Sequence, residues 1–173
     1  MTAQTFAVSV SYFQYLLHTQ DADLTESPYA GGNGLIWVDP AGEAAIIMTG
    51  TDTGPVTLTI DVTDQPPDAD LDTWDDVVEA SVTLTGDGIV IYAPADMEGG
   101  HEVELPASAE ETRTYRLRAH ARGRDQGRAQ QFTDIASSPP EEHLILLWPA
   151  DEADEQRLKL TDAVGAEIRA RTQ

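Results

Sequence analysis

Cationic and apolar residues alternate near the middle of the chain, and the cationic ones could bind an anion. The set, called the arginine stripe below, consists of Arg116, Arg118, His120 and Arg122. Successive side chains of a strand point to opposite faces, so these four are expected on the outer face of a strand whose apolar residues face the core. Guanidinium groups bind carboxylates and phosphates through paired hydrogen bonds. Two hypotheses follow: the stripe is a groove for an anionic small molecule, or acidic residues of neighbouring strands pair with it inside the protein.

A second set of residues suited to chemistry is acidic and lies in and after one polar connection. It comprises Asp68, Asp70, Asp72, Asp75, Asp76 and Glu79. The spacing is similar to that of an EF-hand calcium loop. However, Thr73 stands where that loop needs glycine, and Pro66-Pro67 prevents an entering helix. We therefore expect no metal here and interpret the set as a solvated surface that binds a protein, with a calcium site of another type as the alternative.

The sequence contains no recognisable catalytic motif. It has no cysteine, and its four histidines lack the spacing of metal ligands. A nucleophile elbow, a phosphate-binding loop and a dinucleotide-binding glycine motif are all missing. We expect no cofactor and no catalytic residue, and an enzyme that uses the arginine stripe remains an alternative.

Charge is distributed unevenly along the chain. Residues 1–112 contain no lysine or arginine but 21 of the 31 acidic residues, and the formal net charge is −21. A field of this sign repels nucleic acids and anionic membranes and attracts cationic proteins. Adaptation to high salt, or solubility alone, would produce the same composition. The charge therefore predicts a cationic protein partner and no direct binding of nucleic acid or membrane.

Period-two alternation of apolar residues predicts about nine strands. They lie at residues 6–12, 35–38, 44–48, 56–61, 78–84, 89–92, 103–105, 115–121 and 144–148. Hairpins are expected across residues 39–42 and 86–88, where turn-forming residues separate two strands. A short C-terminal helix is expected after Thr161, although Gly165 lowers its propensity. The pattern is typical of an all-β protein, and we predict an antiparallel β-sandwich.

Length and hydropathy favour a single β-sandwich domain over residues 1–173. No run of about 18 apolar residues is present, so no membrane-spanning helix is expected. The first residues lack the basic and apolar pattern of a signal peptide. The expected location is the cytoplasm.

Several segments resemble known protein families. Residues 74–79, 115–125 and 142–150 resemble a group of bacterial, mostly actinobacterial, β-proteins of unassigned function. The layout also resembles the competence protein J family, which includes an inhibitor of a DNA-entry nuclease, through Ser9-Val10-Ser11-Tyr12-Phe13-Gln14, Tyr29-Ala30-Gly31-Gly32-Asn33-Gly34 and Leu105-Pro106. This resemblance spans about residues 7–148 and implies a β-sandwich that binds a protein. The arginine stripe has no counterpart in that family, and the resemblance identifies no inhibitory residue.

The leading hypothesis is therefore a non-enzymatic acidic protein that inhibits a nuclease or another basic nucleic-acid-binding protein. Carboxylates on a rigid sandwich would occupy the groove that holds phosphates. The alternative is a β-domain that binds an anionic small molecule through the arginine stripe. Under the leading hypothesis, neutralising Asp70, Asp72, Asp75 and Asp76 together should slow association and leave the melting temperature near or above that of the wild type.

Overall fold

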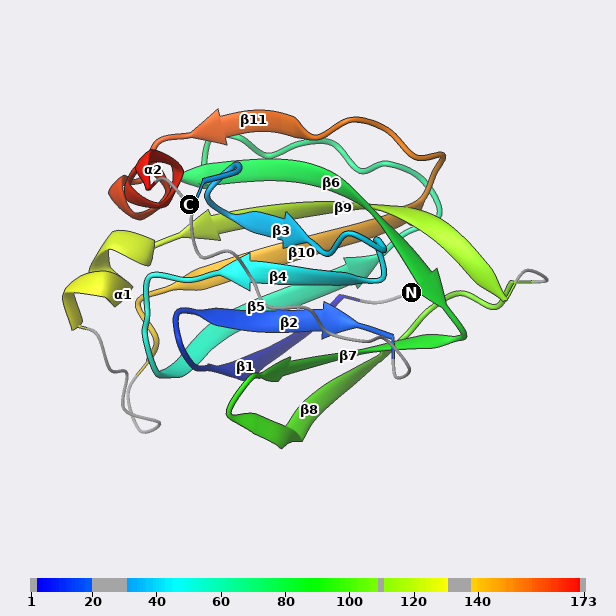
Figure 1. The fold of residues 1–173 in the computed structure, drawn as a ribbon, viewed down its shortest axis with the longest axis horizontal. Coiled ribbons are helices and arrows are strands. Elements are labelled where there is room, and N and C mark those ends of the chain that lie inside the picture. The colour runs from blue at the N-terminus through cyan, green and yellow to red at the C-terminus, as the bar shows by residue number, and fades with distance from the viewer. Residues whose placement is uncertain (1–2, 20–30, 109–110, 131–137, 172–173) are drawn as a thin grey trace.

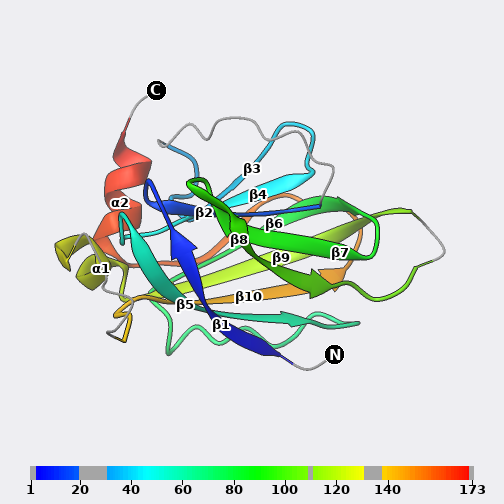
Figure 2. The same ribbon diagram turned by 90° about the horizontal axis from the view of Figure 1, so that it is seen from below.

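The computed structural model describes residues 3–19, 31–108, 111–130 and 138–171, whose backbone forms two packed β-sheets with two short helices at one end (Figure 1, Figure 2). The six-stranded sheet contains, in spatial order, β1 (Gln4–Val10), β5 (Gly54–Val62), β10 (Glu142–Pro149), β9 (Thr112–Arg122), β6 (Asp76–Thr85) and β11 (Gln156–Leu160). The five-stranded sheet contains β3 (Ile36–Val38), β4 (Ala44–Met48), β2 (Gln14–His18), β7 (Gly88–Ala93) and β8 (Asp96–Glu104).

Apolar side chains on the facing sides of the two sheets form the main core. Alternate residues of β9 contribute Tyr115, Leu117, Ala119 and Ala121, and the five-stranded sheet contributes Tyr15, Leu17, Ile47 and Ile91. A smaller apolar cluster lies on the other face of the five-stranded sheet, where α2 (Ala163–Ala170) packs Val164 and Ile168 against Leu16, Ile46 and Met48. Burial of these surfaces stabilises the sandwich by roughly 25 cal/mol per Å² of apolar area.

The structure confirms the all-β sandwich and the C-terminal helix, and each of the nine predicted strands overlaps an observed one. Two strands and one helix were not predicted. β2 follows β1 through the two-residue turn Tyr12-Phe13, which contains neither glycine nor proline. β11 is an edge strand with little apolar alternation, and α1 (Arg124–Gln130) contains Gly127 and lies within a polar connection. These elements lack the local signals on which a prediction from sequence depends.

One predicted hairpin is confirmed and the other is wrong. β3 and β4 pair across residues 39–42, where the Asp39 carboxylate accepts hydrogen bonds from the backbone nitrogens of Ala41 and Ala44 at 3.1 and 2.9 Å. β6 and β7 do not pair across residues 86–88, because β6 pairs with β9 and β7 pairs with β8. The turn at Gly86 instead passes the chain from one sheet to the other.

The pairing of β5 with β10 is parallel, whereas the other strand pairs are antiparallel. Parallel strands end at the same edge of a sheet, so residues 63–75 and residues 150–155 leave the six-stranded sheet at one end. Figure 1 shows both segments turning back there and running along the β11 side of the sheet. These two segments are called the covering segments below.

The N-cap residue of helix α2 is Asp162 rather than Thr161. The Asp162 carboxylate accepts a hydrogen bond from the Gly165 backbone nitrogen at 2.6 Å, which is the usual N-cap interaction. A Cβ at Gly165 would lie 2.6 Å from both Arg124 Nη2 and Asp76 Oδ2, so the glycine is needed for the close approach of these charged groups. α1 and α2 have seven and eight residues, and neither of these described helices could cross a membrane.

Candidate protein-binding surface

The arginine stripe lies on the outer face of β9, as the alternation predicts, yet most of it is buried. Arg116 and Arg118 are only 4% and 6% exposed, and both pair with Glu79 of the adjacent strand β6. Glu79 Oε2 lies 3.3 Å from Arg116 Nη2, and Glu79 Oε1 lies 2.6 Å from Arg118 Nε. A carboxylate shared by the two guanidinium groups offsets the repulsion between stacked like charges.

The other donors of Arg116 hold the second covering segment by its main chain. Nη1 and Nη2 donate to the carbonyl oxygens of Ala153 and Asp154 at 2.8 and 3.2 Å. The Ser81 hydroxyl adds to this contact, because it accepts from Arg116 Nη1 and from the Ala153 backbone nitrogen, both at 3.0 Å. Arg116 therefore fixes the backbone of residues 150–155 against the sheet.

Two further basic residues hold the first covering segment in the same way. Arg118 Nη1 donates to the Pro67 carbonyl oxygen at 2.8 Å, and Lys159 Nζ of β11 donates to the Leu71 carbonyl oxygen at 2.6 Å. These contacts use main-chain oxygens and leave the side chains of Asp64, Asp68, Asp70 and Asp72 exposed to solvent.

The far end of the stripe is half-exposed. Arg122 Nη2 lies 2.6 Å from Glu142 Oε2 of β10, and the guanidinium carbon of Arg122 lies 4.8 Å from the centre of the Trp74 ring. Arg118 stacks in a similar way at 5.0 Å over Trp148. Contacts of this kind between a cation and an aromatic face add to the ion pairs.

Of the two hypotheses for the stripe, the structure favours intramolecular ion pairs. The partner carboxylates, Glu79 and Glu142, come from the two strands that flank β9. Arg116, Arg118 and His120 are buried, so they do not line the open groove that the anion-binding alternative requires. The covering segments lie over the outer face of β9, which the alternation of apolar and polar residues predicts to be exposed to solvent.

The free energy of unfolding is expected to decrease as the pH falls from 6.5 to about 4, partly through His120. Burial lowers the pKa of His120 from 6.5 to about 4, and the Arg118 charge acts in the same direction. Over this range the unfolded chain binds a proton that the folded protein excludes, which lowers stability by up to about 3 kcal/mol. Urea unfolding of the wild type and of His120→Phe across this range checks the prediction. The variant should lose less stability on acidification, and equal losses would contradict it.

The six predicted protein-binding carboxylates divide into exposed and buried groups. Asp68, Asp70 and Asp72 are exposed and Asp75 is half-exposed. Asp76 and Glu79 are buried, so their assignment to a protein-binding surface is corrected. Both belong to β6 rather than to the preceding loop, and both are counterions of buried arginines. Because Asp76 is buried and paired with Arg124, the fourfold neutralisation of Asp70, Asp72, Asp75 and Asp76 is now expected to lower the melting temperature rather than to leave it near or above that of the wild type.

Asp76 belongs to an ion cluster that joins the helices to β6. Its Oδ2 lies 2.8 Å from Arg124 Nη2 and 3.4 Å from Arg169 Nη1, while Arg124 Nε lies 2.5 Å from Asp162 Oδ2. Asp76 Oδ1 also accepts hydrogen bonds from the backbone nitrogens of Thr161 and Asp162 at 2.6 and 3.0 Å. This cluster fixes the point at which the first covering segment enters β6.

Sequence reasoning missed the second acidic segment. It carries Asp151, Glu152, Asp154 and Glu155, all exposed. The acidic run after Pro149 is visible in the sequence, but its proximity to the first covering segment depends on the parallel pairing of β5 and β10. That long-range pairing brings two acidic segments of the chain over one face of the sheet.

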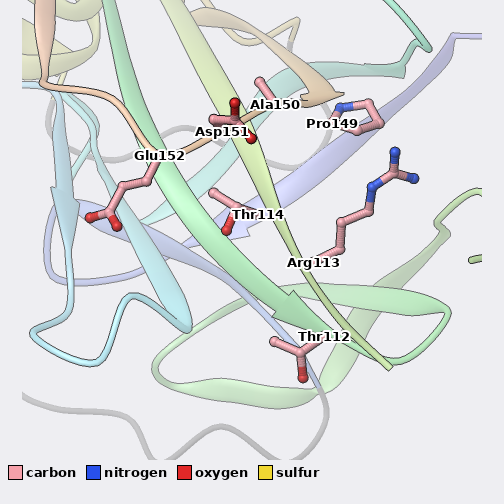
Figure 3. A pocket seen from close by; sticks show the side chains of 7 residues that line it. All are labelled: Thr112, Arg113, Thr114, Pro149, Ala150, Asp151 and Glu152. Atoms are coloured by element: carbon pink, nitrogen blue, oxygen red, sulfur yellow. The ribbon is translucent and has the colours of Figure 1, made fainter. Parts of the chain in front are cut away.

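A pocket of ≈ 490 Å³ lies at the edge from which the second segment leaves (Figure 3). It is lined by Thr112, Arg113, Thr114, Pro149, Ala150, Asp151 and Glu152. Figure 3 shows the Glu152 carboxylate pointing away from the Arg113 guanidinium. The lining therefore does not bring this carboxylate and this cation together for acid–base chemistry.

The loop that resembles a calcium site is organised by its own hydrogen bonds. Asp70 Oδ1 accepts from the backbone nitrogens of Asp72 and Thr73 at 3.1 and 3.2 Å, and the Thr73 hydroxyl donates to Asp70 Oδ2. These bonds lower the pKa of Asp70, the hydroxyl of Thr73 most of all. Within the described residues, no group of three or more histidine, aspartate or glutamate side chains is arranged to hold a metal ion.

A buried relay of three side chains was also missed. Tyr15 Oη lies 3.0 Å from His143 Nδ1, and His143 Nε2 lies 2.9 Å from Glu141 Oε1. The order resembles that of a nucleophile, a base and an orienting carboxylate, but all three residues are buried. Burial, together with the Glu141 charge, raises the pKa of Tyr15 well above its usual value. A phenol that keeps its proton and lacks solvent access is suited to a structural role.

Comparison with known proteins finds similarity in structure alone, since no protein-family model and no curated protein matches the chain. The fold is similar to ComJ from Bacillus subtilis, an inhibitor of the DNA-degrading activity of NucA, with a TM-score of 0.58 and 14% identity over 87% of this chain and 96% of ComJ. The product of crocagin biosynthetic gene J gives the same TM-score of 0.58 and 14% identity over 87% of this chain and 100% of that one. At this identity the likeness establishes a shared fold.

Proposed function

We propose that this protein is a non-enzymatic inhibitor that binds a basic protein, a nuclease or another nucleic-acid-binding protein, through an acidic surface. The acidic surface consists of carboxylates of the covering segments: Asp64, Asp68, Asp70, Asp72, Asp75, Asp151, Glu152 and Asp154. The fold of the chain resembles that of a nuclease inhibitor, which supports the proposal at the level of architecture. The experiment described below is designed to identify the cationic partner.

The observation that carries the proposal is how the acidic surface is supported. Arg116, Arg118 and Lys159 hold the covering segments by main-chain carbonyl oxygens, from beneath. The cations offset part of the repulsion between the two acidic segments, while the carboxylates stay available to a partner. A surface fixed in this way loses little conformational entropy on binding, which favours affinity for a partner of matching shape.

The chemistry of the surface matches that of a groove that binds phosphates. Carboxylates carry the same sign of charge as the phosphate groups that such a groove holds, and a formal net charge of −21 attracts a basic protein from a distance. Association steered by charge is fast at low ionic strength and slows as salt rises. Inhibition would then follow from occupation of the groove, with no reaction on the part of this chain.

Neutralising part of the acidic surface is expected to slow association about tenfold at low salt. The variant combines Asp68→Asn, Asp72→Asn and Glu152→Gln, three exposed residues. The matched control combines Asp87→Asn, Glu102→Gln and Glu104→Gln. These exposed residues lie in the turn before β7 and on β8, and their replacement removes the same charge. Proteins of the producing organism would be captured on immobilised wild type, eluted with salt, and assayed for binding rate and for DNA degradation with and without the free chain.

The proposal requires a captured basic protein that the control binds like the wild type and that the surface variant binds more slowly. It also requires both variants to keep the melting temperature of the wild type, because the replaced side chains are exposed. Equal slowing by both variants would mean that net charge alone governs binding. Capture of a DNA-degrading protein whose activity the free chain leaves unchanged would contradict inhibition.

A further inference from the structure

The turn between β1 and β2 has an unusual backbone. Tyr12 and Phe13 have φ values of 55° and 60°, in the left-handed region that disfavours residues with a side chain. The backbone nitrogens of Ser11 and Gln14 each donate to the carbonyl oxygen of the other residue, at 3.2 and 3.3 Å. This is the geometry of a type I′ turn, here linking strands of different sheets, and asparagine and glycine are its favoured central residues.

Elsewhere the described chain places glycine where φ is positive. The other described residues with positive φ are Gly31, Gly32, Gly34, Gly42, Gly54, Gly86 and Gly123. Among the described residues, those with both a side chain and a positive φ are therefore the two bulky residues of this turn, Tyr12 and Phe13. Strain of this kind concentrates at functional sites, because the surrounding structure must hold it in place.

The surroundings hold the turn firmly. The Phe13 backbone nitrogen donates to the Asp52 carbonyl oxygen at 3.3 Å, and the Phe13 carbonyl oxygen accepts from the Thr49 backbone nitrogen at 2.9 Å. The Arg128 guanidinium of α1 lies 4.5 Å from the centre of the Phe13 ring. The Phe13 side chain thus has a structural role, and the turn is fixed from both sides.

The Tyr12 side chain has the opposite character. It is 62% exposed, whereas the other large hydrophobic side chains that the structure describes are buried or half-buried. A glycine at this position would form the same turn with less strain. The phenol ring is therefore not needed to form the turn or to fill the core, yet the turn holds it in a fixed position in solvent.

We propose that Tyr12 is an anchor that inserts into a pocket of a cationic protein partner. The inference rests on the proposed function, because the partner is taken to be the basic protein that the acidic surface attracts. Tyrosine is enriched among the residues that dominate binding energy at interfaces, and its electron-rich face suits a pocket that contains an arginine or lysine. A rigid turn limits the entropy lost when the ring is buried.

The test compares Tyr12→Gly and Tyr12→Phe with the wild type in stability and in binding. Tyr12→Gly is expected to raise the melting temperature by a few degrees, because it relieves the strained conformation. The same change is expected to weaken binding of the captured basic protein at least about tenfold, mainly through faster dissociation. Tyr12→Phe keeps the ring and should keep the stability and most of the affinity.

The outcomes separate this inference from the proposed function. A lower melting temperature for Tyr12→Gly would assign Tyr12 to the fold and overturn the inference. Unchanged binding by Tyr12→Gly, with binding lost in the variant of the acidic surface, would overturn the inference and leave the proposed function standing. If the wild type retains no basic protein, the proposed function fails and the anchor fails with it. Gain of stability together with loss of binding is the result that the inference requires.

Discussion

Replacing Arg124 with alanine is expected to lower the free energy of unfolding by about 3–5 kcal/mol, because two buried carboxylates lose their cation. Arg124 is fully buried, and its guanidinium donates to Asp76 at 2.8 Å and to Asp162 at 2.5 and 2.8 Å. The carbonyl oxygens of Gly34 and Met48 accept from its Nη1 at 2.8 and 3.3 Å. This single side chain thus connects both helices with both sheets.

Urea unfolding of Arg124→Ala and of Arg157→Ala provides the measurement and its control. Arg157 pairs with Glu155 at 2.8 Å on the surface, where the two side chains are 49% and 37% exposed. Loss of an exposed pair should change the free energy of unfolding by less than about 1 kcal/mol. A similar small change for Arg124→Ala would show that the cluster around Asp76 does not hold the helices in place.

Replacing Glu141 with alanine should produce the second large effect, a loss of about 4 kcal/mol, because several buried donors lose their acceptor. Glu141 accepts from the Gly50 backbone nitrogen at 3.0 Å and from the Thr51 backbone nitrogen and hydroxyl, both at 2.8 Å. His143 Nε2 lies 2.9 Å from the same carboxylate. Removing the carboxylate leaves His143, which also contacts Tyr15, without the negatively charged partner of its Nε2.

The contribution of Glu141 should also disappear in acid. Burial alone would favour the neutral form, but the hydrogen bonds from His143, Thr51 and Gly50 prevail and lower the pKa of Glu141 below 4.5. The folded protein therefore binds this proton less readily than the unfolded chain does. Stability from Glu141 is present above pH 4.5 and is lost as the pH falls through the lowered pKa.

Glu142→Ala is the matched control, since Glu142 is the next residue but is half-exposed and paired with Arg122. Thermal and urea unfolding at neutral pH should show a change of less than about 1 kcal/mol for Glu142→Ala. Glu141→Ala should also lose less stability than the wild type when both are acidified. Equal destabilisation by the two substitutions at neutral pH would contradict a special role for the relay.

Local pattern predicts the fold of this chain well where each strand carries its own alternation. β9 shows this most clearly, because its apolar residues face the core and the arginine stripe faces outward as predicted. β2 is not predicted because the turn before it consists of Tyr12 and Phe13, which are not turn-forming residue types. The break between β6 and β7 is missed because the sequence does not show that a glycine turn leads from one sheet to another.

The candidate site follows from long-range pairing, which limits what the sequence predicts. Alternation places Arg116 and Arg118 on the outer face, but it does not show that the covering segments lie over them. Similarly, Asp76 and Glu79 look continuous with the exposed Asp68, Asp70 and Asp72, yet the strand β6 begins at Asp76. Whether a carboxylate belongs to the loop or to the strand decides whether it meets solvent or a buried arginine.

The central place of β10 in the six-stranded sheet has a consequence for the order of folding during synthesis. β10 joins β5 to β9, but residues 142–149 are made after both of those strands. Until then β1 with β5, and β6 with β9, form two pieces with unpaired edges that invite aggregation. Throughout this interval the nascent chain carries its 21 acidic residues ahead of the first arginine, and mutual repulsion keeps neighbouring chains apart. We therefore expect the acidic N-terminal part to limit aggregation of the growing chain until its late central strand is made.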